Sequence, residues 1–267
     1  SNDVSIVNHG IFLGKSLNEL IDLYPVEMLG KTVYARFGKQ FPLLFKYLDA
    51  REDLSIQLHP NDELAKARHN SFGKTEMWYV MQADENARLI VGFKEDTSRE
   101  EYLHHIENKK LISLLNEVPV KKGDVFFLET GTIHAIGAGI VIAEIQQTSD
   151  ITYRIFDWDR VDANGNEREL HTELALDAIN YKTTFAKKEY KSTENKSTSL
   201  VDCPFFKTNI IPLNGELLIE KNDDSFMVFM CTEGSFELFL NDEKYTYQTG
   251  DTILLPAVLT TFVIKGT

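Results

Sequence analysis

Short runs in which apolar and polar residues alternate recur along the chain, together with a few nearly continuous apolar runs. Successive side chains of a β-strand point to opposite faces, so both kinds of run predict strands that are half or fully buried. The predicted strands fall at residues 41–48, 54–59, 76–80, 87–93, 123–129, 140–147, 151–156, 205–212, 226–231, 236–240, 252–255 and 261–264. After a tight glycine turn, a further strand is expected to carry His134, which would make residues 123–134 a hairpin.

Helical spacing of apolar residues is confined to a few short stretches. A capping box formed by Ser16 and Glu19 predicts a helix that ends at Pro25. Further predicted helices cover residues 61–70, 99–116 (with a break near residue 108) and 170–181. The pattern as a whole indicates a mainly β protein with a few short helices.

The second half of the chain repeats the first in a degenerate form. Residues 250–256 repeat the pattern of residues 123–129, in which a Gly-Asp pair precedes a run of apolar residues. The position that matches His134 is occupied by Thr261, so the second copy is expected to keep the strand frame without the histidine. Residues 187–199 are polar, which is typical of a linker. We predict a first β domain with a helical insertion over 1–160, which carries His134, a helix and polar linker over 161–199, and a degenerate β domain over 200–267 built as a sandwich or jelly roll.

Composition narrows the class of protein. The 267 residues are 43% hydrophobic and 26% charged, as in ordinary globular proteins. The net charge of −13 argues against a nucleic-acid partner, because binding to phosphates needs a basic face. No apolar run approaches a membrane span and no secretion signal is evident, so we expect no membrane partner. Two isolated cysteines, Cys203 and Cys231, favour a reducing compartment and a cytoplasmic location.

Four side chains on separate predicted strands could form a metal site. Gln57 and His59 are two residues apart on one strand and therefore share a face, while Glu76 and His134 lie on two others. Two imidazoles, a carboxylate and an amide oxygen suit zinc or another borderline divalent metal with room for substrate. If only two of these strands were considered, the simpler interpretation would be favoured: a histidine and a glutamate in a half-buried sheet, with no metal.

Cations on neighbouring strands would suit an anionic substrate in this acidic protein. Arg154 interrupts an alternating strand, where a guanidinium is unusual unless it meets an anion. Lys46 and Lys74 lie on strand segments close to the proposed ligands. For Arg154 the alternative is an ordinary salt bridge, for which the sequence offers Asp150, Asp157 and Asp159.

Four separated motifs occur in an order that resembles type I mannose-6-phosphate isomerase in its short bacterial form. They are Ser-Ile-Gln-Leu-His-Pro-Asn-Asp at 55–62, Gly-Lys-Thr-Glu-Met-Trp-Tyr at 73–79, Gly-Thr-Ile-His-Ala at 131–135, and Gln-Gln-Thr-Ser-Asp-Ile-Thr-Tyr-Arg at 146–154. The likeness runs from about Val4 to the end of the chain. Two features depart from the family pattern: no Trp-Gly-Gly segment opens the chain, which we expect to lack that N-terminal part, and Glu129 stands where cupin motifs commonly carry proline.

The resemblance implies two cupin-type jelly-roll units and a zinc-dependent enzyme, with one Zn²⁺ per chain, that interconverts mannose 6-phosphate and fructose 6-phosphate. By motif match, Gln57, His59, Glu76 and His134 would bind the zinc. Arg154 matches the active-site arginine, and Lys46, Ser55, Lys74 and Glu144 match pocket positions, Glu144 being our choice for proton transfer. The rival interpretations are a non-haem iron oxygenase, since two histidines and a carboxylate form its facial triad, and a non-catalytic sugar-binding cupin.

Overall fold

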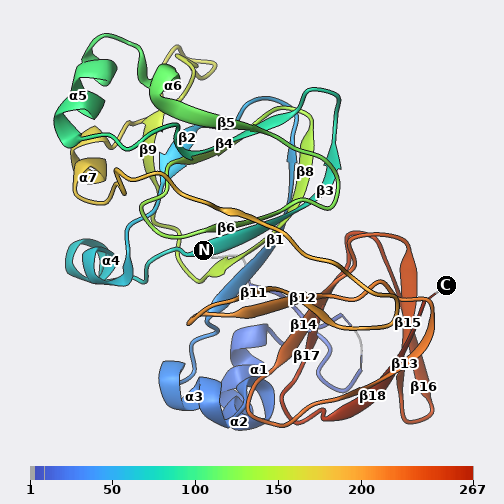
Figure 1. Cartoon of the computed structure of the whole chain (residues 1–267). Helices are drawn as coiled ribbons and strands as arrows, with labels where there is room; N and C mark the ends of the chain where they lie inside the picture. The colour runs from blue at the N-terminus through green and yellow to red at the C-terminus, as the bar shows by residue number, and fades with distance from the viewer. Residues whose placement is uncertain (1–3, 9, 267) are drawn as a thin grey trace. The chain divides into compact units, whose positions relative to one another are not determined.

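The computed structural model describes residues 4–8 and 10–266, and it confirms the mainly β architecture (Figure 1). The chain divides into two compact units. The larger unit comprises Leu43–Tyr190 and Leu200–Thr208, and the smaller comprises Ser1–Pro42, Lys191–Ser199 and Asn209–Thr267. None of the helices among the described residues is long and apolar enough to cross a membrane. The domain boundaries expected from the sequence, near residues 160 and 199, stay a prediction.

Two five-stranded antiparallel sheets build the larger unit. The first has the strand order β1-β8-β3-β6-β10 and the second the order β5-β4-β7-β2-β9. The first sheet contains β1 (Leu43–Ala50), β8 (Ile140–Gln147), β3 (Glu76–Ala83), β6 (Val125–Leu128) and β10 (Lys187–Lys188). The second contains β5 (Leu115–Pro119), β4 (Arg88–Phe93), β7 (His134–Ile136), β2 (Ile56–Leu58) and β9 (Tyr153–Phe156).

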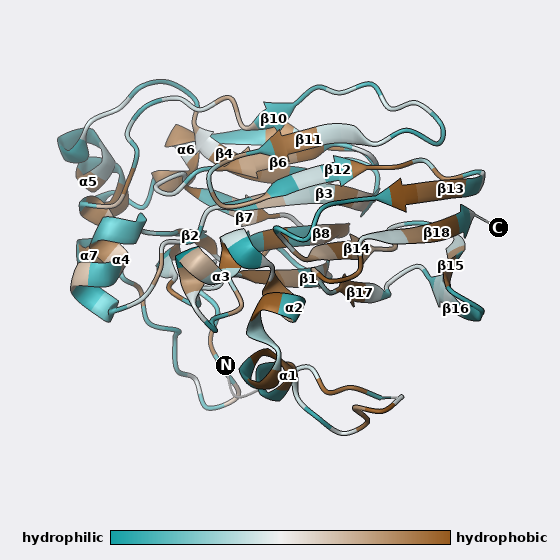
Figure 2. Cartoon of the chain, turned by 90° about the horizontal axis from the view of Figure 1, so that it is seen from below, coloured by the Kyte–Doolittle hydropathy of each residue, from teal (hydrophilic) through white to brown (hydrophobic). Residues whose placement is uncertain are grey.

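The two sheets bury one core between them. Trp78, Val80 and Phe126 from the first sheet pack in one cluster with Leu89 and Val91 from the second. In Figure 2 the apolar colour follows the strands, whereas α5 (Arg99–Glu107) and the loops are mostly hydrophilic. Successive side chains along each strand point alternately into this core and away from it.

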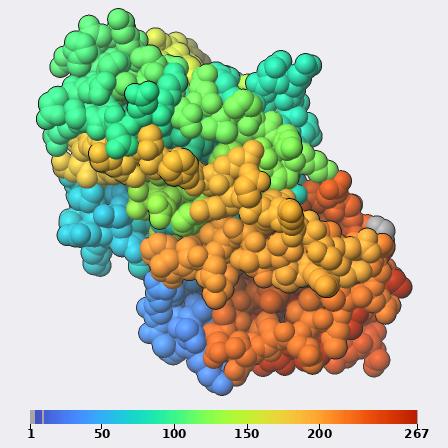
Figure 3. All heavy atoms as spheres, in the orientation of Figure 1, coloured from blue at the N-terminus to red at the C-terminus, as the bar shows by residue number. Residues whose placement is uncertain are grey.

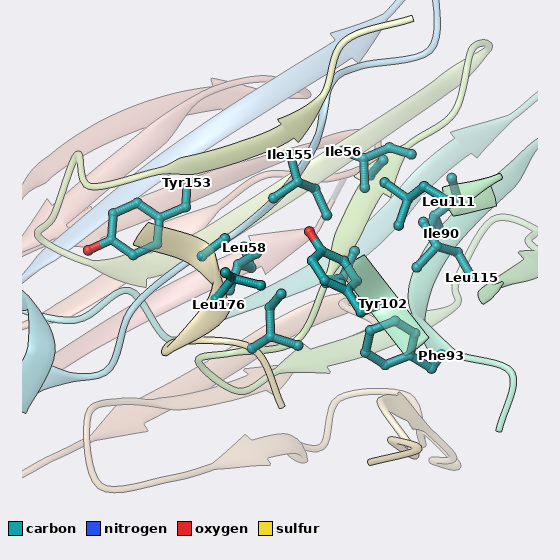
Figure 4. Close-up of a cluster of buried hydrophobic side chains, with 14 residues drawn as sticks. Ile56, Leu58, Ile90, Phe93, Tyr102, Leu111, Leu115, Tyr153, Ile155 and Leu176 are labelled. Carbon is teal, nitrogen blue, oxygen red and sulfur yellow. The ribbon is translucent and has the colours of Figure 1, made fainter. Parts of the chain in front are cut away.

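Helices cover the outer face of the second sheet. They are α5, α6 (Leu111–Leu114) and α7 (Thr172–Leu176), while α4 (Asp62–His69) follows β2. Figure 4 shows Tyr102 of α5 and Leu176 of α7 meeting Leu58, Tyr153 and Ile155 from β2 and β9. Residues 99–114, in green, form part of the outer surface seen in Figure 3. Because Tyr153 and Ile155 face the helices, Arg154 between them faces the other sheet.

The smaller unit combines both ends of the chain. Its sheets are β13-β18-β15-β16 and the pair β14-β17. Its elements are α1 (Leu17–Leu23), α2 (Pro25–Leu29), α3 (Lys31–Phe37), β13 (Gly215–Glu220), β14 (Met227–Met230), β15 (Ser235–Leu240), β16 (Glu243–Gln248), β17 (Thr252–Leu255) and β18 (Thr261–Gly266). The N-terminal segment joins the C-terminal strands through backbone hydrogen bonds, such as Phe226 N–H to the Leu29 carbonyl at 3.1 Å. Strands β11 (Thr198–Asp202) and β12 (Lys207–Ile210) form a separate two-stranded sheet.

The Gly-Asp turn of the expected internal repeat has the same local geometry in both units. Asp124 accepts a hydrogen bond from the backbone N–H of Lys121 at 3.1 Å, and Asp251 accepts one from Gln248 at 2.8 Å. The glycine before each aspartate has a positive φ, 89° and 96°, which a side chain would disfavour. Each turn leads into the strand that follows it, β6 in one unit and β17 in the other. Both units therefore start this strand in the same way, while the full jelly-roll order stays a prediction.

Several expected elements differ from the structure. The prediction of a hairpin over residues 123–134 is wrong. Strands β6 and β7 lie in different sheets, because the turn at Gly131 leads the chain from the first sheet to the second. Pro25 does not only end α1 but also begins α2, where its missing N–H has no helical partner to lose. The helix expected at 170–181 is only α7, and the linker expected at 187–199 contains β10 and the start of β11. Five further elements, α2, α3, β5, β13 and β16, were not predicted from the sequence, and β5 begins inside the helix expected over 99–116.

Candidate metal centre

Two histidines and a glutamate converge between the two sheets. One ligand atom each of His59, Glu76 and His134 lies within 4.8 Å of the others, and the three residues are 1–2% exposed. His59 Nε2 is 3.5 Å from Glu76 Oε2, and His134 Nε2 is 3.4 Å from Glu76 Oε1. Both carboxylate oxygens therefore face an imidazole nitrogen, as expected of side chains that could share an ion.

The strand order explains this convergence. His134 begins β7 and Glu76 begins β3, in the opposite sheet, while His59 directly follows β2. Gln57 of β2 is the cross-strand partner of His134, which places the proposed amide ligand beside the histidine. The turn before β7 is tied to the first ligand strand, since Gly131 N–H donates to the His59 carbonyl at 2.8 Å.

The side chains themselves fit a metal ion. Nδ1 of His59 is 2.9 Å from the Ile151 carbonyl, and Nδ1 of His134 is 2.8 Å from the Thr132 carbonyl. A carbonyl can only accept, so each Nδ1 carries the proton and each Nε2 keeps its lone pair. Glu76 Oε1 and His134 Nε2 are buried without a hydrogen-bond partner among the described residues. Orphaned acceptors aimed at one point are what a cation would satisfy.

The protonation states also suit metal ligands. Burial, and then the charge of Lys74, lower the pKa of His59 to about 4. Burial likewise lowers the pKa of His134. Burial acts to raise the pKa of Glu76, but Lys74 and the histidines outweigh it and hold that pKa well below its ordinary value. The centre thus offers neutral imidazoles and a carboxylate, the forms that bind metal ions.

Lys74 completes the polar cluster. It is 5% exposed, and its ammonium donates to Glu76 Oε2 at 2.5 Å and to His59 Nε2 at 3.1 Å. Burial would lower its pKa, but the carboxylates of Glu76 and Glu144 reverse that effect and raise it. A buried lysine that stays charged beside the ligands is suited to hold an anionic or hydroxyl group of a substrate.

A cavity of about 170 Å³ opens beside these residues. Its lining includes five of the residues proposed from the sequence besides His134, namely Lys46, Ser55, Gln57, Lys74 and Glu144. Trp78, Asp150 and Thr152 also line it. Cationic, anionic and hydroxyl groups on one small cavity are typical of a site for a polar small molecule.

One row of side chains crosses the first sheet at this cavity. Lys46, Glu144 and Trp78 are cross-strand partners on β1, β8 and β3. Glu144 Oε1 accepts from the Lys46 ammonium at 3.1 Å, and Oε2 accepts from the Trp78 indole N–H at 2.9 Å. Lys46 also donates to Gln146 Oε1 at 2.5 Å. Glu144 is consequently held on both oxygens by donors.

Arg154 lies beside this group, outside the lining of the cavity. It is the cross-strand partner of Gln57, and its guanidinium donates to the Glu169 carbonyl at 2.9 Å. Burial, followed by the charge of Arg168, lowers its pKa, and its Nε is buried with no hydrogen-bond partner in the described part of the chain. Asp157, one of the salt-bridge partners considered from the sequence, instead binds Arg168 and Arg160.

Trp78 had no role in the sequence-based prediction, although a signal was available. Trp78 is two residues after Glu76 on β3, so both share one face of the strand. Its indole ring meets His134 edge-on, with centroids 5.3 Å apart and planes at 84°. The same side chain therefore contacts a candidate metal ligand and Glu144.

Comparison with known proteins agrees with this geometry. A family model described as the catalytic domain of type I phosphomannose isomerase matches residues 6–89, and one described as the cupin domain of mannose-6-phosphate isomerase matches residues 196–267. Mannose-6-phosphate isomerase ManA of Bacillus subtilis is 36% identical over 99% of this chain and 83% of its own length. A mannose-6-phosphate isomerase of Streptococcus mutans is also 36% identical, over 99% of this chain and 82% of its own length.

A solved structure gives the same result for the fold. The crystal structure of mannose 6-phosphate isomerase from Bacillus subtilis superposes with a TM-score of 0.88 at 35% identity, covering 99% of this chain and 83% of that one. The fold and the His-Glu-His cluster define a cupin-class protein with a candidate metal centre. Within that class, the chain belongs to the type I mannose-6-phosphate isomerase family.

Proposed function

We propose that this protein is a zinc-dependent aldose–ketose isomerase that interconverts mannose 6-phosphate and fructose 6-phosphate. The observation that carries the proposal is the convergence of His59, Glu76 and His134 beside a cavity lined by Lys46 and Lys74. Relatives that match nearly the whole chain are named mannose-6-phosphate isomerases, which supports the substrate. The two free thiols are consistent with a reducing compartment such as the cytoplasm.

Gln57, His59, Glu76 and His134 would hold one Zn²⁺ per chain. Two histidines and a glutamate are common ligands in catalytic zinc sites, and the amide oxygen of Gln57 would add a neutral fourth ligand. With one formal negative ligand, the bound ion keeps a net positive charge and supplies a Lewis acid close to the substrate oxygens. The carbonyl partners of both Nδ1 atoms fix the rings for this role.

The residues around the cavity would bind and orient a sugar phosphate. Lys46 and Lys74 supply positive charge and Ser55 a hydroxyl, so they would hold the phosphate and the sugar oxygens. Isomerisation moves one proton between adjacent carbons and another between their oxygens, and negative charge develops on those oxygens. We assign Arg154 to the stabilisation of that charge, because its Nε has no partner among the residues that the structure describes.

Glu144 is our choice for the proton-transfer residue. Its carboxylate lines the cavity, where a bound substrate could reach it, and at 4% exposed it is shielded from bulk solvent. Lys46, one of its two donors, is only partly buried and could release Glu144 Oε1 when a phosphate draws the ammonium away. The oxygen so released would be the atom that takes and returns the proton.

A coupled assay on mannose 6-phosphate, run with metal analysis of the same preparation, tests this function. We expect about one zinc per chain and turnover that a chelator abolishes and zinc restores. Metal content without turnover would instead support a non-catalytic sugar-binding cupin. Oxygen uptake with bound iron would support the oxygenase.

A further inference from the structure

Trp78 occupies an unusual place at the candidate site. The residue is 1% exposed, its ring edge meets His134, and its indole N–H donates to Glu144 Oε2 at 2.9 Å. An indole nitrogen can only donate, and buried tryptophans ordinarily need a partner for it. Here that partner is the carboxylate assigned to proton transfer, not a backbone carbonyl.

The sheet fixes this arrangement rigidly. Trp78 and Glu144 are cross-strand partners on the neighbouring strands β3 and β8, and Glu76 shares its strand and face with Trp78. Because the backbone ladder fixes both strands, the distance between the indole nitrogen and the carboxylate cannot drift far. A flexible donor such as lysine would not impose the same constraint.

We propose that Trp78 is a positioning residue that orients the Glu144 carboxylate for proton transfer, an inference that rests on the proposed function. Its N–H fixes Oε2 and thereby turns Oε1 toward Lys46 and the cavity. Trp78 and Glu144 are 1% and 4% exposed, so this bond is shielded from bulk solvent and its loss is costly. The ring meanwhile packs on His134, which places the carboxylate at a set distance from the metal ligands.

The substitution Trp78→Phe separates this role from simple packing. Phenylalanine keeps an aromatic ring against His134 and deletes only the N–H donor and part of the ring. We expect kcat to fall roughly 10–100-fold, the usual effect of removing such an outer hydrogen bond, with KM and zinc content close to those of the wild type.

The second of the two tryptophans in the chain provides a matched control. The Trp158 indole N–H donates to the Leu54 carbonyl at 2.9 Å, and therefore not to a carboxylate of the site. Trp158→Phe also deletes one indole hydrogen bond, at a less buried position, so it should leave kcat unchanged and lower stability no more than Trp78→Phe does. Equal losses of kcat in the two variants would overturn the proposal, and so would a parallel loss of zinc in Trp78→Phe, which would assign the effect to His134.

A spectroscopic measurement tests the contact without relying on turnover. With ¹⁵N-labelled tryptophan the protein has two indole N–H resonances, and Trp158→Phe identifies the one from Trp78. Substituting Glu144→Gln should shift the Trp78 resonance strongly and the Trp158 resonance little. An unmoved Trp78 resonance would refute the proposal even if Trp78→Phe failed to fold. Absence of isomerase turnover in the zinc-loaded wild type would refute the proposed function, whatever the spectrum shows.

Discussion

At the scale of single residues, backbone carbonyls orient the candidate metal ligands. The Nδ1 atoms of His59 and His134 lie 2.9 and 2.8 Å from the carbonyls of Ile151 and Thr132. A carbonyl does not titrate, so the tautomer of each imidazole is fixed by main-chain geometry over a wide pH range. No charged side chain is therefore needed at either Nδ1.

Arg154 provides the first prediction. Arg154→Ala removes the guanidinium assigned to the developing negative charge, and losing one such electrostatic contact typically lowers kcat by about 10²–10³. The fold should suffer little, because the side chain donates to the backbone carbonyl of Glu169 and forms no salt bridge within residues 4–8 and 10–266. Steady-state kinetics and thermal unfolding of the variant check this. A near-normal kcat would remove Arg154 from the mechanism.

Tyr102 provides a stability prediction in the helix-covered core. The residue is fully buried, its hydroxyl has no hydrogen-bond partner among the described residues, and burial raises the pKa of Tyr102 well above its ordinary value. Figure 4 shows this hydroxyl among apolar side chains. Tyr102→Phe removes a polar group that costs about 1–3 kcal/mol when buried unpaired, so the free energy of unfolding should stay equal or rise. Urea unfolding measures it, and a clear loss of stability would reveal a partner for the hydroxyl.

At the scale of elements, the turn at Gly131 leads directly into the strand that carries His134. Its φ is +84°, and an added Cβ would lie 2.6 Å from the Ala178 carbonyl oxygen. Its N–H also bonds to the His59 carbonyl, and its own carbonyl accepts from Asn180 N–H at 2.9 Å. This turn carries the chain from one sheet to the other, just before His134.

Gly131→Ala should accordingly lower both stability and metal affinity. A side chain here is strained by the positive φ and clashes with a backbone atom that cannot move freely, effects of roughly 1–3 kcal/mol for strain alone. Gly165→Ala is the control, since Gly165 has a similar φ of +81° and open space around it. We expect weaker zinc binding in a chelator competition only for Gly131→Ala. Equal effects in both variants would show that strain, and not displacement of His134, is responsible.

Local pattern predicted strands and caps well, but it did not predict which strands pair. The Ser16–Glu19 capping box and the helix after Asn61 are confirmed, because they depend on residues three positions apart. The predicted hairpin is wrong because a glycine turn of this kind can either close a hairpin or lead from one sheet to another. The local sequence does not distinguish these outcomes, which depend on contacts with distant residues such as that of Gly131 with Ala178. Likewise β16 is too polar to be recognised without its partner β15.

The candidate site shows the same limit. Residue types and the two-residue spacing indicated Gln57, His59, Glu76 and His134, and the structure brings the last three together. The same reasoning did not connect Trp78 with Glu144, which are 66 positions apart in sequence. Their contact depends on the register of β3 against β8, which no local pattern specifies.

At the scale of the whole molecule, the candidate metal cluster lies in one of two compact units. All proposed site residues lie within Leu43–Tyr190. The smaller unit repeats the glycine–aspartate turn, yet the described residues contain one candidate metal cluster, that of the larger unit. Thr261 stands where the repeat would place a histidine. The second unit therefore keeps the strand frame while the first carries the ligands.

Metal removal tests this asymmetry in the whole protein. A ligand that binds only the folded state stabilises it by RT ln(1 + [L]/Kd), about 2.7 kcal/mol at one hundred times Kd. Chelation should therefore abolish turnover and lower the unfolding temperature, and added zinc should reverse both. His134→Ala should show a much smaller zinc-dependent shift in unfolding temperature, because it loses one of the proposed ligands and the described residues offer no second candidate cluster. A shift as large as that of the wild type would place the metal site elsewhere in the chain.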